Sequence, residues 1–145
     1  MDHYSRSLDS ARANGNPHAT GVALRGLAVA SCVLGDTAAL ARSVEALDLL
    51  YHLRYWQKAY QVLEDIAYSL TVAGHLEDAA VVAGFLEHEL PHGYGMENDL
   101  GFRPVVLRRI EHQPARLELL RRGAAMTRDQ LANFVLTESA AHLAD

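Results

Sequence analysis

The chain is poor in cysteine, proline and lysine, and each scarcity has its own implication. Only one of its 145 residues is cysteine, Cys32, so the chain can form neither an internal disulfide nor a cysteine-based metal site. Only four residues are proline, which leaves long stretches free to form helices. Lys58 is the single lysine among 13 basic residues, an arginine bias that indicates a GC-rich genome rather than a function.

Long hydrophobic runs are also lacking. No stretch reaches the roughly 18 apolar residues that a membrane-spanning helix needs. Residues 29–32, Val-Ala-Ser-Cys, resemble a lipoprotein cleavage box. However, only a few apolar residues precede them after Arg25, and Asp2 and Asp9 stand where a signal sequence carries basic residues. We therefore expect a cytoplasmic protein without membrane contact.

The net charge of −5 gives no overall positive field that would attract nucleic acid. The charge is uneven, because residues 1–100 carry 6 basic and 13 acidic side chains, whereas residues 101–130 carry 7 arginines against 3 acidic residues. Neither interleaved aromatic residues nor a helix-turn-helix pattern accompanies these arginines, so we expect no direct contact with nucleic acid. Docking to an acidic surface, such as residues 77–99 of a second copy, is the favoured role.

Alanine and leucine, which lose little side-chain entropy in helices, dominate the chain, and their spacing follows the helical period almost throughout. The pattern predicts an all-α protein of about seven helices, at residues 3–14, 18–34, 37–54, 55–73, 76–90, 104–122 and 127–142. We expect Gly35, Gly74 and Gly123 to end three of these helices. We expect Pro114 to break or kink the sixth, and Thr127 to begin a capping box.

The sequence repeats itself with an offset of 39 residues. The aligned pairs are Leu24 with Leu63, Leu27 with Ile66, Ala28 with Ala67, Val33 with Val72, Gly35 with Gly74, Ala41 with Ala80, and Leu47 with Leu86. A period near 40 predicts stacked helical hairpins of the tetratricopeptide type, which form a right-handed solenoid. The hairpins at 18–53 and 55–90 should then superpose with that offset. Small residues such as Ala67 and Ala79 allow helix backbones to approach closely.

Several stretches, in this order and spacing, resemble one family. They are residues 7–12 (SLDSAR), 23–28 (ALRGLA), 34–36 (LGD), 63–67 (LEDIA), 73–80 (AGHLEDAA), 82–84 (VAG) and 123–127 (GAAMT), the last followed by a helix. Together they resemble the C-terminal helical-repeat region of large actinobacterial transcription regulators that have a signal-transduction ATPase core. These are the LuxR-type and antibiotic-regulator-type proteins, some of them fused to adenylate cyclase domains. The resemblance implies a sensory or scaffold role rather than chemistry.

The chain departs from that family at identifiable points. Ile110-Glu111 stands where the family usually has a Leu-Gly pair, and Leu117 or Leu119 stands where an aromatic residue is usual. The sequence contains no GxxxxGK[ST] phosphate-binding loop and no DNA-binding part. It therefore matches either an excised fragment or a stand-alone relic of such a region.

Residues 88–92, His-Glu-Leu-Pro-His, match the HExxH signature of metalloproteases. In that motif both histidines lie on one helical turn to share a zinc ion, and the glutamate polarises the bound water. Pro91 lies inside this turn, where it removes a backbone donor and disfavours helix at Leu90. We expect a helix end with polar histidines and no metal or other cofactor. A small metal-dependent hydrolase using His88, Glu89 and His92 remains the alternative.

Tyr51, Tyr55, Trp56 and Tyr60 form the densest aromatic cluster, with Trp56 and Tyr60 one helical turn apart. Packing at a hairpin junction accounts for this pattern. The alternative is a ligand or peptide groove, because Tyr and Trp are favoured at interfaces. The candidate interaction surface comprises three of these aromatic residues and four arginines: Tyr55, Trp56, Tyr60, Arg108, Arg109, Arg121 and Arg122.

These observations predict a single domain with tetratricopeptide-like hairpins at 1–92, a loop at 93–102, and C-terminal helices at 103–145 that pack on the repeats. The predicted function is a non-catalytic binding and regulatory module of a transcriptional regulator, which contacts a protein or a small-molecule effector. A purely structural repeat segment is a further alternative. We also expect the isolated chain to form a homodimer, because an apolar face around Tyr4, Leu8 and Ala11 lacks a partner helix.

Overall fold

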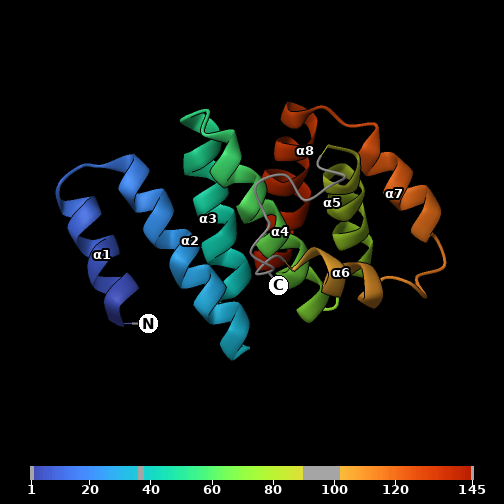
Figure 1. Cartoon of the computed structure of the whole chain (residues 1–145), viewed down its shortest axis with the longest axis horizontal. Helices are drawn as coiled ribbons and strands as arrows, with labels where there is room; N and C mark the ends of the chain where they lie inside the picture. The colour runs from blue at the N-terminus through green and yellow to red at the C-terminus, as the bar shows by residue number, and fades with distance from the viewer. Residues whose placement is uncertain (1, 36–37, 90–101, 145) are drawn as a thin grey trace.

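The computed structural model describes residues 2–35, 38–89 and 102–144, without the side chains of residues 2–4 and 144. Every regular element in these ranges is helical, which confirms the all-α prediction (Figure 1). The α-helices are α1 (Asp2–Ala13), α2 (Pro17–Leu34), α3 (Ala39–His52), α4 (Trp56–Val72), α5 (Leu76–Glu89), α6 (Arg103–Arg109), α7 (Arg116–Ala124) and α8 (Arg128–Phe134). A π-helical turn (Val135–Ser139) and a 3-10 turn (Ala140–Ala144) continue α8. Figure 1 shows α1 at one end of the molecule, α4 in the middle and α7 at the other end.

Local signals in the sequence explain where several helices begin and end. The side chain of Asn16 accepts a hydrogen bond from the backbone N–H of Ala19 and so caps α2, which begins at Pro17. Gly35 follows α2 with a φ of 71°, a left-handed conformation that glycine adopts without a steric penalty. Thr127 and Gln130 form the predicted capping box at the start of α8.

The segment predicted as one helix at 104–122 is broken around Pro114 into two helices, as expected, whereas Gly123 does not end the second. Pro114 lacks the N–H that would bond to the carbonyl of Ile110, and the N–H of Gln113 takes that carbonyl instead, at 3.0 Å. Residues 110–115 therefore form a turn between α6 and α7. Helix α7 continues through Gly123 to Ala124, and this glycine serves a close contact between helices instead of a turn.

Helices α5 and α7 cross with their backbones in close contact at two glycines. A Cβ added to Gly84 would lie 2.1 Å from the carbonyl oxygen of Leu120, and one added to Gly123 would lie 1.8 Å from that of Val81. No real Cβ atom tolerates such distances. The absence of side chains at these two positions is therefore what allows α7 to pack on α5.

The 39-residue repeat agrees with the positions of the first helices. Helices α2 and α4 begin 39 residues apart, at Pro17 and Trp56, whereas α3 and α5 begin 37 residues apart, at Ala39 and Leu76. Four aligned pairs are buried at both positions: Leu24 and Leu63, Leu27 and Ile66, Ala28 and Ala67, and Leu47 and Leu86. The pair of Ala41 and Ala80 differs, because Ala41 is exposed and Ala80 is buried. Superposition of the two hairpins and a right-handed solenoid remain predictions.

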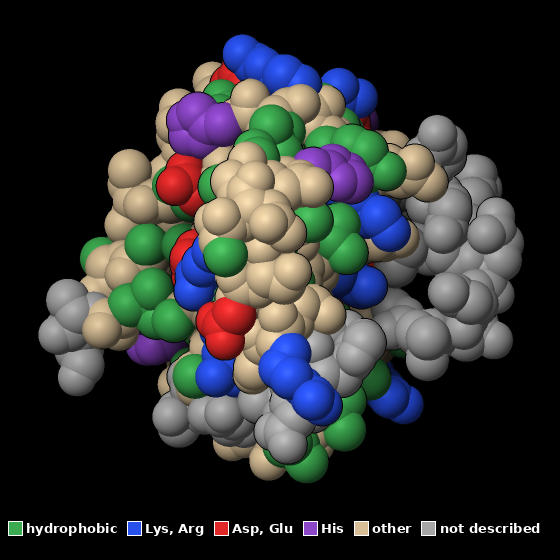
Figure 2. Space-filling model, turned by 90° about the vertical axis from the view of Figure 1, so that its left-hand side faces the viewer, with side chains coloured by type: hydrophobic (Ala, Val, Ile, Leu, Met, Phe, Trp, Pro, Cys, Tyr) green, Lys and Arg blue, Asp and Glu red, His purple; other side chains and the backbone are tan. Residues whose placement is uncertain are grey.

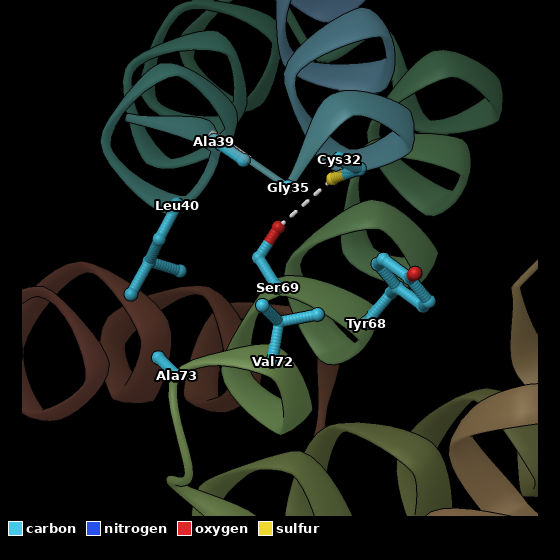
Figure 3. Close-up of a pocket in the computed structure, with 8 residues that line it drawn as sticks. All are labelled: Cys32, Gly35, Ala39, Leu40, Tyr68, Ser69, Val72 and Ala73. Atoms are coloured by element: carbon cyan, nitrogen blue, oxygen red, sulfur yellow. Dashed lines mark hydrogen bonds between the residues drawn. The ribbon is translucent and has the colours of Figure 1, made fainter. Parts of the chain in front are cut away.

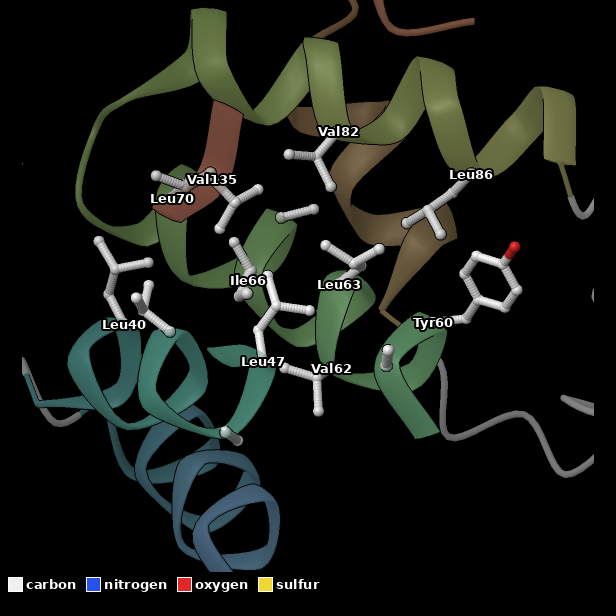
Figure 4. Packing of buried hydrophobic residues seen from close by; sticks show 14 of the residues in the cluster. Leu40, Leu47, Tyr60, Val62, Leu63, Ile66, Leu70, Val82, Leu86 and Val135 are labelled. Carbon is white, nitrogen blue, oxygen red and sulfur yellow. The ribbon is translucent and has the colours of Figure 1, made fainter. Parts of the chain in front are cut away.

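One hydrophobic cluster includes residues from α1 through to Val135. Figure 4 shows its centre, where Leu63 and Ile66 of α4 lie between Leu47 of α3 and Val82 of α5. Val135 is fully buried in the same cluster, so the segment after α8 contributes to the core. Of the loop predicted at 93–102, only Phe102 is described.

Helix α1 covers α2 and is itself partly buried by it. Leu8 and Ala11 are buried inside the chain. The expectation that this face needs a partner outside the chain is therefore wrong for these two residues, because α2 supplies the contact; the side chain of Tyr4 lies outside the described part. Figure 2 shows the end of the molecule that α1 forms, where charged and hydrophobic side chains alternate without one large apolar area.

One helix in the described ranges, α2, is long and apolar enough to cross a membrane by length and composition alone. The expectation that no such segment exists was based on uninterrupted apolar runs, whereas an average over 18 residues tolerates a few polar ones. About 44% of this helix is buried inside the protein, where it packs against α1 and α3. The core helix of a soluble protein and a signal sequence can have the same length and composition as such a helix.

Candidate functional site

The predicted aromatic cluster forms at the junction between α3 and α4. The ring of Trp56 lies 5.5 Å from that of Tyr51, edge to face, and 5.9 Å from that of Tyr60. Tyr60 is buried and also approaches Phe85 of α5, at 6.1 Å. Tyr55 does not join this group, because it contacts His18 of α2 with a centroid separation of 4.8 Å.

The start of α8 covers the rings of Trp56 and Tyr60. The guanidinium of Arg128 lies 5.2 Å from the Trp56 centroid and 5.6 Å from that of Tyr60, both within the range of cation–π attraction. Tyr60 donates a hydrogen bond to Glu89 at 3.0 Å, and the same carboxylate lies 3.6 Å from Nε of Arg128. Burial, and then this hydrogen bond, raise the pKa of Tyr60.

A second contact from α8 reaches the other side of the same cluster. Tyr51 donates a hydrogen bond to Asp129 at 2.6 Å, and Arg54 lies 3.7 Å from that carboxylate. The aromatic cluster therefore holds the C-terminal helix in place, as well as joining α3 to α4. Sequence reasoning missed Arg128 and Asp129, because only the capping box marked this part of the chain.

The four candidate arginines lie on two helices and contact different parts of the molecule. Arg109 of α6 stacks on Tyr68 at 4.8 Å and donates a hydrogen bond to the hydroxyl of Thr71 at 3.0 Å. Arg122 of α7 lies 5.2 Å from the ring of Phe134 and 3.7 Å from the carboxylate of Glu138. The remaining two, Arg108 and Arg121, are exposed.

The HExxH string is described only in its first two residues. His88 is exposed at the end of α5, and the carboxylate of Glu89 is engaged by Tyr60 and Arg128. Pro91 and His92 lie outside the described residues. A zinc site would require an unbroken helix through position 92, and the expectation that Pro91 breaks it therefore stays a prediction. Among the residues with described positions, no group of three His, Cys, Asp or Glu side chains is placed to hold a metal ion.

A serine, a histidine and an aspartate do meet near the C-terminus, in an order unsuited to nucleophilic catalysis. Asp78 accepts hydrogen bonds from both the Ser139 hydroxyl, at 3.1 Å, and the His142 ring, at 2.9 Å. In a catalytic triad the histidine lies between the serine and the acid, so that it can take the serine proton. Here the acid lies in the middle, and His142 stacks on His75 instead, at 3.6 Å. The group fixes the last turns of the chain against the start of α5.

Two buried carboxylates on α4 form ion pairs with neighbouring helices. Nε of Arg25, on α2, lies 3.0 Å from Asp65, and Nε of Arg103, on α6, lies 3.2 Å from Glu64. Burial raises the pKa of Asp65 to about 7, although Arg25 opposes the shift, and burial also raises the pKa of Glu64. These pairs link α2, α4 and α6.

A pocket of about 120 Å³ opens between the ends of α2 and α4 and the start of α3 (Figure 3). It is lined by Cys32, Gly35, Ala39, Leu40, Tyr68, Ser69, Val72 and Ala73. The thiol of Cys32 and the hydroxyl of Ser69 share a hydrogen bond of 3.1 Å. Burial raises the pKa of the Cys32 thiol and so disfavours its reactive thiolate form. Sequence reasoning missed this pocket, because its residues come from separate helix ends.

Comparison with protein families, curated proteins and solved structures finds no match to this chain.

Proposed function

We propose that the chain is a non-catalytic helical-repeat binding module of a transcriptional regulator, which contacts a protein partner or a small-molecule effector. The observation that carries the proposal is that α2 and α4 begin 39 residues apart and bury three aligned pairs of residues, as repeated hairpins would. Stacked hairpins present equivalent residues of successive repeats side by side, and proteins of this architecture use such surfaces for binding. The regulatory context rests on the order and spacing of the family-like stretches described above.

An exposed apolar surface at the ends of the two repeats supports a binding role. Val33 and Val72 are equivalent in the repeat, and they are 73% and 52% exposed; Leu34 is 69% exposed. Val72 lines the same pocket as Cys32 and Gly35, the neighbours of Val33 and Leu34 in the chain. We call Val33, Leu34 and Val72 the turn-end surface. Apolar side chains that gather on a surface favour contact with a partner.

A second copy of the chain is the partner that we propose for the isolated protein. The exposed Arg108, Arg121 and Arg122 of α6 and α7 carry positive charge on a chain whose net charge is −5. Complementary charges of this kind set the register and the rate of association more than its affinity. A symmetric dimer is the expected form, because closed two-fold assemblies are the commonest.

Deletion of the chain in its native host, followed by sequencing of the transcripts, tests the regulatory role. We expect a defined set of transcripts to change and the wild-type chain to restore them. A Val33→Asp/Val72→Asp double variant should fail to restore them, because it places charge on the turn-end surface. Val22→Asp is the matched control, since Val22 is also exposed on α2, at 41%, but is not part of that surface. Transcripts that do not change on deletion would overturn the proposal.

A further inference from the structure

We propose that the pocket between α2, α3 and α4 binds a small, mostly apolar compound, the size of one six-membered ring, that carries a single hydroxyl group. This inference deepens the effector part of the proposed function and rests on it for its biological role. The binding itself follows from the size of the pocket, its apolar lining and its one polar pair, Cys32 and Ser69.

The size of the pocket limits the ligand to about one ring. Its volume is about 120 Å³, and an engineered protein cavity of roughly 150 Å³ binds benzene. Much of the lining is apolar, from Ala39 and Leu40 of α3 and from Val72 of α4. Figure 3 shows Leu40 on one side and the ring of Tyr68 on the other, with Val72 and the hydrogen-bonded Cys32 and Ser69 between them. Burying an apolar ring against these side chains gains hydrophobic free energy.

The hydroxyl group of the ligand follows from the Cys32–Ser69 pair. Both residues are buried, and each side chain has one hydrogen and lone pairs. Their mutual hydrogen bond uses only one of the two hydrogens. The pair therefore keeps one donor and at least one acceptor inside the pocket. A ligand hydroxyl satisfies these groups, whereas a pure hydrocarbon leaves them unmatched and loses the corresponding free energy.

The chemistry of the pocket favours reversible binding of a free compound. Burial raises the pKa of the Cys32 thiol, which disfavours the thiolate, the form that attacks a ligand covalently. The aliphatic side chain of a protein partner would fill the apolar part and leave the polar pair unengaged. Val72 lines the pocket and is 52% exposed, so part of the lining lies at the protein surface, where an apolar compound can reach it.

Phenol and toluene are the probes, because they have nearly the same size and differ in a hydroxyl group. Titration of the 15N-labelled chain should give saturable chemical-shift changes at the backbone amides of Ser69 and its neighbours. We expect phenol to bind about three- to tenfold more tightly than toluene, which corresponds to one net hydrogen bond. Ser69→Ala should remove this preference while toluene still binds.

Filling the pocket should abolish binding of both probes. Ala39→Leu places three extra carbons in the lining, and Ala41→Leu is its matched control, because Ala41 is exposed on the same helix, two residues away. If Ala39→Leu does not fold, as judged by circular dichroism, Ala73→Leu replaces it, since Ala73 lines the pocket and is itself exposed.

Three results would overturn the proposal. They are no saturable binding of either probe to the wild type, unchanged binding in the folded filling variant, and equal affinity for phenol and toluene. N-acetyltyrosinamide distinguishes a protein side chain from a free compound: if it binds more tightly than phenol, the occupant is a partner's side chain and the proposal is wrong. If deletion of the chain changes no transcripts while phenol still binds the pocket, the regulatory role is wrong and the ligand site stands.

Discussion

Gly123→Ala tests the close crossing of α5 and α7. In an ordinary helix interior this substitution stabilises by about 0.5–1 kcal/mol, because alanine loses less backbone entropy than glycine. Here the new Cβ would lie 1.8 Å from the carbonyl oxygen of Val81 and 2.9 Å from the backbone nitrogen of Phe85. Both atoms belong to the backbone of α5, so relief requires the two helices to move apart. Overpacking of this kind costs about 1–3 kcal/mol or more, and we expect a net loss of about 2 kcal/mol.

Urea denaturation followed by circular dichroism measures this loss, and Gly21→Ala is the matched control. Gly21 is also buried in a helix, but its added Cβ would meet side-chain atoms and no backbone atom, with Cδ2 and Cγ of Leu50 at 3.1 and 3.2 Å. We expect the midpoint of Gly123→Ala to fall by about 1 M and that of Gly21→Ala to change by less than about 0.3 M. A Gly123→Ala variant as stable as the wild type, or more stable, would refute the close crossing.

Three further changes test other parts of the structure. Ala67→Leu should destabilise the protein by about 1–3 kcal/mol in a thermal melt, because Ala67 is buried at a small-residue position of the repeat; an unchanged melt would contradict this contact. The pKa of Asp65 is raised from 3.8 to about 7, so the folded state binds more protons than the unfolded state between these values, and the contribution of Asp65 to stability falls as pH rises through that window. Asp65→Asn should therefore flatten the dependence of unfolding free energy on pH between about 4 and about 7, and an unaltered slope would exclude Asp65 as its source. Calorimetry with zinc should show weak binding, and His88→Ala should leave the fold intact; a tight one-to-one site that is lost in this variant would favour the hydrolase alternative.

The helices were predictable because their signals are local. Apolar spacing, the turn glycines at 35 and 74, and the capping box at Thr127 each depend on neighbours in the chain. The 39-residue offset between the starts of α2 and α4 was also predictable, since it appears when two segments of the same sequence are compared. The break in the segment at 104–122 was also predictable, because Pro114 lies in the turn between α6 and α7.

The contacts between helices were not predictable from the same signals. Gly123 resembles a helix-ending glycine in sequence, and only the position of α5 shows that it makes room for Val81. Glu64 and Asp65 are charged, and in sequence charged residues indicate a solvent-exposed position. Only the apolar neighbours Leu63 and Ile66 indicate that this part of the helix is buried. Their arginine partners are about 40 residues away, a separation that no local pattern encodes.

The candidate surface was only partly predictable for the same reason. Trp56 and Tyr60 meet as their spacing on one helix indicates. Tyr55 lies apart, and the two residues that cover the cluster, Arg128 and Asp129, are more than 60 positions away in the sequence. The pocket depends on three helix ends, so its existence required the arrangement of α2, α3 and α4.

Sedimentation equilibrium of the isolated chain, over a wide range of protein concentration and at low and high salt, tests the central claim of a binding module most directly. The proposed association joins the arginines of α6 and α7 to the acidic remainder of a second copy, so salt should weaken it by screening these charges. The account predicts a monomer–dimer equilibrium at low salt that shifts towards monomer at high salt. A monomer at every concentration, independent of salt, would contradict it.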